Sequence, residues 1–376
     1  MGYVKLTSMS FYNRLGVRRV INAAFCLTDL GGSRLSKEVQ EAYLEANTNF
    51  VEMKQLEEKA GIFLAEITGA EAAFVTTGAF AALSLSTAAC ITRNDAEKMK
   101  RLPDTAGMKN QVLIQANLRT TFDRSLEIPG GKIVPVGTVE KGCSQDEFEV
   151  AINEKTAAIH YLAMLDSVRS DILPLEKVIE IGHRHGVPII VDAAGQTYPT
   201  ERVKIFIAKG ADLVCYSGKY FGGPQSTGFV CGRKDLVDCV AANSFVGPGG
   251  WIGRGYKVDR QEIVALLVAV ENWMKMDHEK ERLKPAVKKQ KYIINELNSI
   301  SGLRCEGQPY SYHVVGIKVT LDKSPEETAA VIKRLREDDP AIWVRNQRGS
   351  GFLMNTLLLR NGEEKEIVDK FKSVFK

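Results

Sequence analysis

Between residues 69 and 232 the sequence alternates short apolar segments with segments of helical periodicity, and this alternation limits the possible folds more than any other feature. The expected strands are 72–76, 112–114, 132–136, 157–162, 188–191, 213–216 and 228–231. Helical patterns lie between several of them, for example at 79–91, 175–185 and 204–209. Short apolar strands that alternate with helices are typical of a mainly parallel sheet with helices on its faces. We therefore expect an α/β fold.

The segments on either side of this region extend the predicted organisation. Residues 1–60 begin as an irregular arm and continue as a helix, for which Ser36 is a suitable N-cap. Residues 61–260 form the expected large α/β domain, and residues 261–285 a connecting helix that Pro285 ends or kinks. Residues 286–376 predict a small C-terminal α/β domain. Its strand patterns lie at 313–320, 342–345 and 353–359, and its helical patterns at 325–337 and 363–375.

The composition argues against several classes of protein. The chain of 376 residues has 50 basic and 46 acidic side chains, a net charge of +4. This balance is too even to predict a nucleic-acid or membrane surface. The first residues lack the apolar core of a signal peptide. The seven cysteines contain no CxxC pair, so we expect no metal site and no disulfide framework. Cys90, Cys215 and Cys231 lie in apolar segments and predict buried, reduced thiols in a cytoplasmic protein.

The first segment that suggests chemistry runs from Val75 to Phe80, where an expected strand meets an expected helix. Small and hydroxyl-bearing residues at such a junction leave backbone N–H groups free at the helix N-terminus. These groups and the helix dipole favour an anion such as a phosphate. The alternative is an ordinary N-cap at Thr77 that begins a tightly packed alanine-rich helix.

Two further segments add a carboxylate and a lysine. An apolar strand ends at Asp192, and ligands of parallel sheets bind at the carboxyl ends of strands. A second strand is followed by Lys219 between glycines, 27 positions later, so both residues can lie at the same sheet edge. Pyridoxal phosphate (PLP) needs both groups: a carboxylate that keeps the ring nitrogen protonated and a lysine that forms an imine. Taken alone, Asp192 could simply begin a turn and Lys219 could be solvated.

In these residues the sequence resembles the PLP-dependent enzymes of fold type I. It is most similar to the branch that contains L-seryl-tRNA selenium transferases and D-glucosaminate-6-phosphate ammonia-lyases. The resemblance covers nearly all of residues 15–275. It is carried by VINA (20–23), FVEM (50–53), TGAE (68–71), TTG (76–78), LPDT (102–105), VDAA (191–194), SGK (217–219) with GP (223–224), and IGR (252–254) with KV (257–258).

This resemblance implies a role for each matching residue. The residues that would hold the cofactor phosphate are Thr76, Thr77, Gly78, Ala79 and Ser217. Asp192 would face the pyridine nitrogen, and Lys219 would form the Schiff base. Arg254 and Lys257 resemble a basic pair of the active site, and we expect them at the start of a helix, where they would bind an anionic group of the substrate. They could instead form a surface pair or contact the cofactor phosphate of a neighbouring subunit.

Three features depart from the pattern of this branch. Its members usually have one residue between Ser-Gly and the lysine, an acid in the selenium transferases, whereas Ser217-Gly218-Lys219 is contiguous. The chain also has too little sequence before residue 15 for a tRNA-binding domain. Both features argue against selenocysteinyl-tRNA synthesis. Leu118 stands where ammonia-lyase-like members have a histidine expected to cover the pyridine ring, and a leucine can cover the ring but cannot transfer a proton. His160, inside an apolar strand, is expected to be a satisfied core residue.

The sequence therefore predicts a PLP-dependent lyase or transferase of fold type I. It would act on a small, anionic amino acid or amino sugar acid by α-deprotonation, with ammonia-lyase or β-elimination chemistry as the main expectation. An aminotransferase, a racemase or a binding protein that has lost catalysis are the alternatives. We expect a cytoplasmic homodimer or higher homo-oligomer with a small-molecule substrate and no nucleic-acid or membrane partner.

Overall fold

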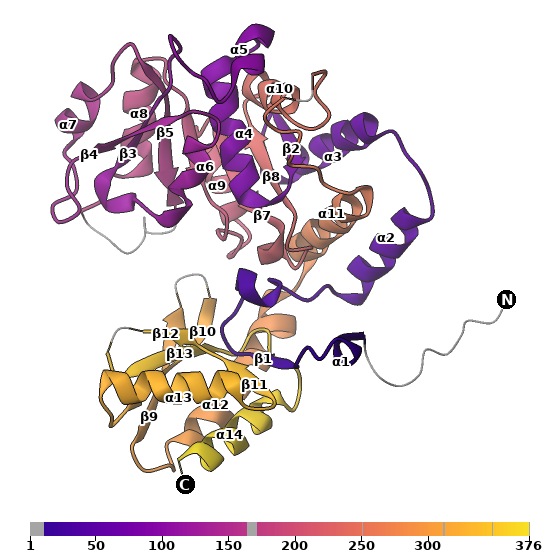
Figure 1. Ribbon diagram of the computed structural model, residues 1–376, viewed down its shortest axis with the longest axis vertical. Coiled ribbons are helices and arrows are strands. Elements are labelled where there is room, and N and C mark those ends of the chain that lie inside the picture. Colours follow the sequence, from indigo (N-terminus) through magenta and orange to yellow (C-terminus); the bar gives the residue numbers. More distant parts are fainter. Residues whose placement is uncertain (1–10, 164–170, 250, 311–312, 348, 376) are drawn as a thin grey trace. The chain divides into compact units, whose positions relative to one another are not determined.

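A computed structural model describes residues 11–163, 171–249, 251–310, 313–347 and 349–375. The chain divides into two compact units (Figure 1). The large unit consists of Gly32–Lys275, and the small unit combines Met1–Gly31 with Met276–Lys376. Each unit has a hydrophobic core of its own.

The large unit is built around a seven-stranded sheet in the order β2-β8-β7-β6-β5-β3-β4 (Figure 1). Its strands are β2 (Ala72–Thr76), β3 (Gln111–Gln115), β4 (Lys132–Val136), β5 (Thr156–Leu162), β6 (Ile189–Asp192), β7 (Leu213–Ser217) and β8 (Gly228–Gly232). The pairs from β4 through β7 are parallel, and β8 runs antiparallel to both β7 and β2. The predicted strands are all present, with small changes at their ends.

Helices cover both faces of this sheet. Side chains of α3 (Met53–Thr68), α8 (Leu175–Arg184), α9 (Arg202–Ala208) and α11 (Arg260–Lys275) share one core with one face. Side chains of α4 (Gly78–Thr92), α6 (Arg124–Glu127) and α10 (Lys234–Asn243) share another core with the opposite face. The remaining helices of this unit are α2 (Lys37–Asn47), α5 (Ala96–Arg101) and α7 (Gln145–Val150). Successive strand residues point to opposite faces, as in Ile189 and Ile190.

The small unit contains a four-stranded antiparallel sheet in the order β12-β13-β10-β9 and a two-stranded parallel sheet of β1 and β11. Its strands are β1 (Val20–Asn22), β9 (Leu303–Tyr310), β10 (His313–Leu321), β11 (Ala341–Trp343), β12 (Arg345–Asn346) and β13 (Gly351–Asn355). Its helices are α1 (Phe11–Arg14), α12 (Lys284–Leu297), α13 (Pro325–Glu337) and α14 (Glu363–Val374). Because Val20 pairs with Ala341, the N-terminal segment is part of this unit.

The course of the chain differs from the sequence-based expectation in two places. Residues 1–60 do not group together, because the division between the units falls after Gly31. The expected helix at 261–284 is also interrupted: α11 ends at Lys275, a π-helical turn spans Glu279–Leu283, and α12 begins at Lys284. Pro285 therefore lies in the first turn of α12, directly after the π-helical turn that interrupts the expected helix.

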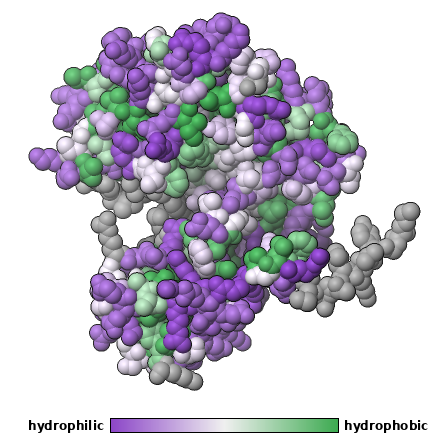
Figure 2. Space-filling view, in the orientation of Figure 1, coloured by the Kyte–Doolittle hydropathy of each residue, from purple (hydrophilic) through white to green (hydrophobic). Residues whose placement is uncertain are grey.

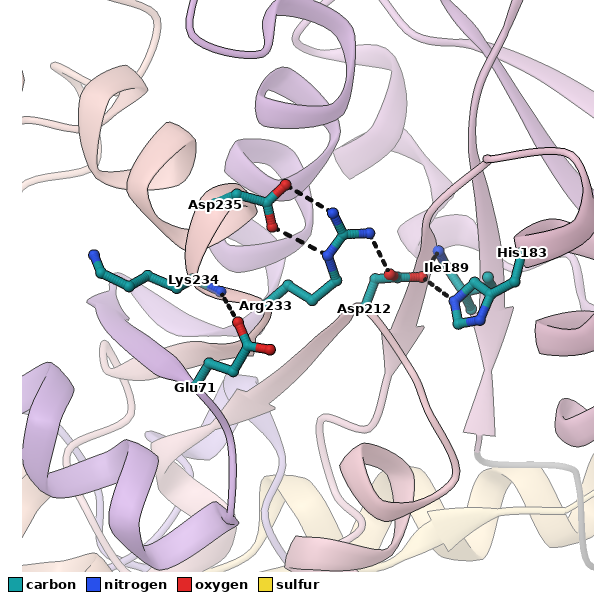
Figure 3. Close-up of polar contacts among 7 residues, drawn as sticks. All are labelled: Glu71, His183, Ile189, Asp212, Arg233, Lys234 and Asp235. Carbon is teal, nitrogen blue, oxygen red and sulfur yellow. Dashed lines mark hydrogen bonds and ion pairs between the residues drawn. The ribbon is translucent and has the colours of Figure 1, made fainter.

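A hydrogen-bonded network fixes the amino ends of β6 and β7 (Figure 3). Asp212, directly before β7, is almost fully buried, with 1% of its surface exposed. Its carboxylate accepts hydrogen bonds from the Ile189 N–H (2.9 Å), from His183 Nε2 (2.9 Å) and from Arg233 Nη1 (3.0 Å). Arg233 also binds Asp235 in the first turn of α10. Two strands and two helices are thus joined at one buried carboxylate.

Hydrophilic residues cover much of the face shown in Figure 2, and the hydrophobic residues on it lie in separate clusters. Among the described residues, no helix combines the length and the apolar composition that crossing a membrane requires. Cys90, Cys215 and Cys231 are buried and free, as predicted.

Candidate active site

The carboxyl ends of β2, β6 and β7 bring predicted site residues to one edge of the large sheet. Thr76 and Ser217 both pair with Gly228, and Asp192 pairs with Cys215, two residues before Ser217. Strand alternation places all three side chains on the face that α4 covers, since Phe74, Ile190 and Cys215 of the same parity belong to the core shared with α4. The sheet geometry therefore gathers these three residues, as the sequence predicted.

Asp192 is a buried carboxylate with spare bonding capacity. Only 8% of its surface is exposed, and Oδ1 accepts the N–H of Ala194 at 3.0 Å. Burial raises the pKa of Asp192 to about 6, and the nearby carboxylate of Asp123 acts in the same direction. Asp192 has no ion-pair partner among the residues described. A cationic N–H group placed against it would supply both the charge and the hydrogen bond that the carboxylate lacks.

The N-terminus of α4 lies at the same edge. Gly78 has φ +78°, which favours glycine, and a Cβ atom there would meet open space. Within the described residues, Thr77 makes no side-chain capping hydrogen bond. Gly228 packs against the turn, because a Cβ at Gly228 would lie 2.6 Å from the carbonyl carbon of Gly78 and 2.8 Å from the nitrogen of Ala79. The turn is thus held close to the sheet without a side-chain cap, which suits an anion.

Lys219 follows β7 in a short 3₁₀ turn, Gly218–Phe221. Two hydrogen bonds tie this segment to the chain after Asp192. The Ser217 N–H donates to the Ala194 carbonyl (3.1 Å), and Thr197 Oγ1 donates to the Tyr220 carbonyl (3.2 Å). Lys219 is partly buried, and its Nζ lies 5.5 Å from the centroid of the Tyr220 ring. The segments that carry Asp192 and Lys219 therefore form one connected edge.

Arg254 and Lys257 occupy a different setting from the one predicted. The preceding glycine-rich segment contains Gly250, which lies outside the described residues. Both cations are exposed and lie before α11, which begins only at Arg260. Turn hydrogen bonds from the Arg254 N–H to Trp251 and from the Tyr256 N–H to Gly253 hold this segment outside the helix. The expectation that the pair shares one face of a helix start is wrong, although both residues remain in the large unit.

Of two buried titratable residues near the edge, Asp123 was missed by the sequence analysis and His160 differs from its expected setting. Asp123 is buried and accepts the Thr120 N–H (3.2 Å) and hydroxyl (3.3 Å), and it is also bonded to Arg119. His160 of β5 is buried, and its Nδ1 has no hydrogen-bond partner among the described residues, so the expectation of a satisfied core histidine is wrong. Burial lowers the pKa of His160 to about 4, against the opposing effect of Asp123. The Thr-x-x-Asp capping pattern was the available signal for Asp123.

Leu118 does not cover the edge as the resemblance suggested. Its side chain has no exposed surface and packs in the core with residues such as Ile114 and Tyr161. A side chain with no accessible surface cannot contact a cofactor ring where it stands. The residue after it, Arg119, is partly exposed and bonded to Asp123.

The described geometry can be compared with known proteins. The family model described as SelA: L-seryl-tRNA selenium transferase matches residues 20–300, which is more than half of the chain. The chain belongs to the L-seryl-tRNA selenium transferase family. In this family, the L-seryl-tRNA(Sec) selenium transferase of Aquifex aeolicus is 26% identical over 70% of this chain and 60% of its own length.

Two relatives are more similar in sequence. A 5′-C-glycyluridine monooxygenase-decarboxylase of a Streptomyces species is 32% identical over 89% of this chain and 84% of its own length. A D-glucosaminate-6-phosphate ammonia lyase of Salmonella typhimurium is 34% identical over 70% of both chains.

Solved structures agree with the sequence relationship. A structure of D-glucosaminate-6-phosphate ammonia-lyase has a TM-score of 0.85 at 29% identity and covers 98% of both chains. A structure of SPT with PLP has a TM-score of 0.59 at 15% identity, over 95% of this chain and 87% of that one, which supports the fold alone. The comparisons confirm the predicted enzyme branch, fold type I and PLP as its cofactor.

Proposed function

We propose that this family member is a PLP-dependent enzyme that removes the α-proton of a small, anionic amino acid or amino sugar acid and expels a β-substituent, as an ammonia-lyase does. The observation that carries this proposal is Asp192, a buried carboxylate with one backbone hydrogen bond at the edge where β2 and β7 also end. The relationship to an ammonia lyase at 34% identity supports the reaction type.

The residues present fit the proposed cofactor. The uncapped first turn of α4 offers backbone N–H groups to a phosphate, with Thr76, Thr77 and Ser217 beside it. Asp192 would hold a proton on the ring nitrogen, and Lys219 would bind the cofactor covalently. When bound, PLP supplies an electron sink for the carbanion that α-deprotonation leaves. The amine of Lys219, once the amino group of the substrate has replaced it on the cofactor, would accept the α-proton and donate a proton to the departing β-substituent.

The shape of the lysine turn supports the prediction against selenocysteinyl-tRNA synthesis. Gly218 occupies the position before Lys219, and a Cβ atom there would lie 2.1 Å from Thr227 Oγ1. The Gly218 N–H also donates to the Thr227 carbonyl at 2.7 Å. The position before Lys219 is therefore restricted to glycine, and this shorter turn lacks the acidic residue that precedes the lysine in selenium transferases.

Covalent attachment tests the assignment of Lys219 most directly. We expect the purified protein to show the absorbance of a bound PLP imine, and borohydride to fix the cofactor on the peptide that contains Lys219. Lys219→Ala should abolish both signals because it removes the amine that is proposed to form the imine. Lys209→Ala, at a partly buried lysine paired with Glu176, is the matched control and should retain them. A trapped adduct on another lysine would refute the assignment.

Arg254 and Lys257 are proposed to bind the anionic group of the substrate. Their exposure in a segment that is not part of a helix leaves both cations free to approach a ligand, and a guanidinium can clamp a carboxylate or phosphate with two hydrogen bonds. With Arg254→Ala we expect KM to rise about tenfold or more while PLP content stays constant. Loss of PLP on dialysis would instead indicate a contact with cofactor phosphate. No change in either quantity would remove the pair from the site.

We also propose that the protein is a homo-oligomer. Large apolar side chains are exposed around α2 and α3, with 66% of Leu44, 94% of Phe50 and 49% of Ile62 accessible. The centroid of the Phe50 ring also lies 4.9 Å from the guanidinium carbon of Arg260. Large apolar side chains exposed on neighbouring segments of the chain would lose this exposure at a subunit interface. Sedimentation equilibrium should give a mass of at least two chains, and a monomer at micromolar concentration would contradict the proposal.

A further inference from the structure

One buried acid in the large unit has no part in the function proposed above. Glu57 lies in the second turn of α3 with 2% of its surface exposed. Its Oε2 accepts the N–H of Val75 at 3.1 Å, while Oε1 has no hydrogen-bond partner in the part of the chain that the structure describes. Burial raises the pKa of Glu57 to about 8, and the Val75 hydrogen bond opposes this shift. Burying an acid with so few hydrogen-bond partners lowers the stability of the fold, so we expect it to have a specific role.

The position of Glu57 follows from the edge of the sheet. Strand β2 is an edge strand that pairs only with β8, so its other side presents backbone groups without a strand partner. Helix α3 lies along this side. One turn after Glu57, Gly61 approaches so closely that a Cβ atom would lie 2.2 Å from the Ala73 carbonyl oxygen. Glu57 and Gly61, four residues apart, thus share the helix face that contacts β2.

The backbone group that Glu57 binds is next to the proposed phosphate turn. Val75 directly precedes Thr76, whose Oγ1 donates to the Gly78 carbonyl at 3.0 Å. On one side, the end of β2 is fixed by its pairing with Gly228. On the other side, the Glu57 carboxyl group is the contact that holds Val75. The turn therefore begins from a strand end that is held from both sides.

We propose that Glu57 is a positioning residue for the cofactor-phosphate turn, holding the Val75 N–H so that the first N–H groups of α4 stay aimed at the phosphate. The inference rests on the proposed function, because it assumes that this turn binds the phosphate of PLP. Glu57 does not touch the cofactor. It acts through the backbone of residues 75–78, and its role is carried by the hydrogen bond and not by its charge.

Two cofactor forms separate this role from general stability. PLP carries the phosphate and pyridoxal does not, while both have the same ring and aldehyde. We would measure the dissociation constants of both for the apoenzyme by absorbance titration. For the wild type, PLP should bind much more tightly than pyridoxal. Equal affinities would show that the turn does not hold the phosphate, and the proposed function would fail independently of Glu57.

Three variants then test Glu57 itself. Glu57→Leu keeps the buried volume and removes the acceptor, and should weaken PLP binding about tenfold while pyridoxal affinity changes less than twofold. Glu57→Gln keeps a neutral acceptor and should restore PLP affinity to within about twofold of the wild type. Glu58→Gln, at the exposed neighbouring position, is the matched control and should leave both constants unchanged.

Backbone amide exchange keeps the test decisive if Glu57→Leu folds poorly. In Glu57→Gln the Val75 amide should remain protected, and in Glu57→Asp, whose shorter side chain withdraws the acceptor, the amides of residues 75–80 should exchange faster than in the wild type. An unchanged ratio of PLP to pyridoxal affinity in Glu57→Leu would overturn the proposal. Unchanged exchange at residues 75–80 in Glu57→Asp would also overturn it.

Discussion

Two buried aspartates stand at opposite ends of neighbouring strands in the large unit, and their surroundings differ sharply. Asp212, at the amino end of β7, accepts hydrogen bonds from a backbone N–H, a histidine and an arginine (Figure 3). Asp192, at the carboxyl end of β6, accepts one from Ala194. The first carboxylate is fully engaged by the fold. The second is not, and burial without compensation raises its pKa to about 6.

The difference between the partners of these two carboxylates indicates which end of the sheet binds a ligand. Evolution of a stable fold favours carboxylates with complete sets of partners, as at Asp212. A carboxylate kept buried with incomplete partners costs stability, and such a cost is expected where a ligand completes the set. On this reasoning the carboxyl edge of the sheet is the functional end and the amino edge is the structural end.

The largest expected effect concerns the functional end. Asp192→Asn keeps the shape of the side chain but removes the charge that holds a proton on the ring nitrogen. We expect turnover to fall about 100-fold or more, equivalent to roughly 3 kcal/mol of barrier. The free energy of unfolding of the apoenzyme should not fall, and should rise at neutral pH because the buried charge is removed. Steady-state kinetics and urea denaturation measure the two quantities. A loss of turnover below about tenfold would mean that Asp192 does not tune the cofactor.

The matching change at the structural end should give the opposite result. Asp212→Asn removes the charge that pairs with Arg233 and His183, and leaves one amide oxygen to serve three donors. Because Arg233 is half exposed, we expect a loss of about 2 kcal/mol in unfolding free energy, below the value for fully buried pairs. Turnover per folded molecule should stay within about twofold. If activity fell while stability did not, the division between the two ends would be incorrect.

The smallest expected effect is on the pH dependence of stability and concerns a third buried group, His160. Burial lowers its pKa to about 4 from 6.5, so the neutral form is favoured in the folded state. The contribution of neutral His160 to the free energy of unfolding is fully present above pH 6.5 and is lost as the pH falls toward 4. At pH 5.5 the wild type should therefore have lost about 1 kcal/mol relative to pH 7.5, and His160→Gln should lack this component. Equal pH dependence of the two proteins would show that His160 is accessible to protonation.

The sequence was sufficient to predict the parts of the site that follow from strand periodicity. Thr76, Asp192 and Ser217 each end an apolar strand, and parallel strands that end together bring such residues to one edge. The roles of these residues and of Lys219 remain predictions. Arg254 and Lys257 were misplaced because turn hydrogen bonds around Gly253 hold them in a non-helical segment before α11, and such local bonding has no clear periodic signal.

Other features depend on contacts between distant residues and were not predictable from local pattern. Strand β1 has three residues, and its partner Ala341–Trp343 lies more than 300 positions later. Strand β9 was missed because Gly307, Gln308 and Pro309 interrupt its apolar alternation. Glu57 and Asp123 are both buried, and their burial was not predictable because acidic side chains are usually exposed.

The pairing of β2 with β8 has a consequence for synthesis of the protein. Strand β2 is the first strand of the large sheet to be made and β8 is the last, yet they are neighbours. The turn at Thr76–Gly78 is packed against Gly228, so it cannot take its final form until the ribosome has added about 150 further residues. A nascent chain that ends before β8 exposes an unpaired strand and a helix without charges, both of which favour aggregation. We therefore expect the phosphate turn to form only when the sheet is complete, so a chain truncated before β8 should bind PLP weakly even though it contains Lys219.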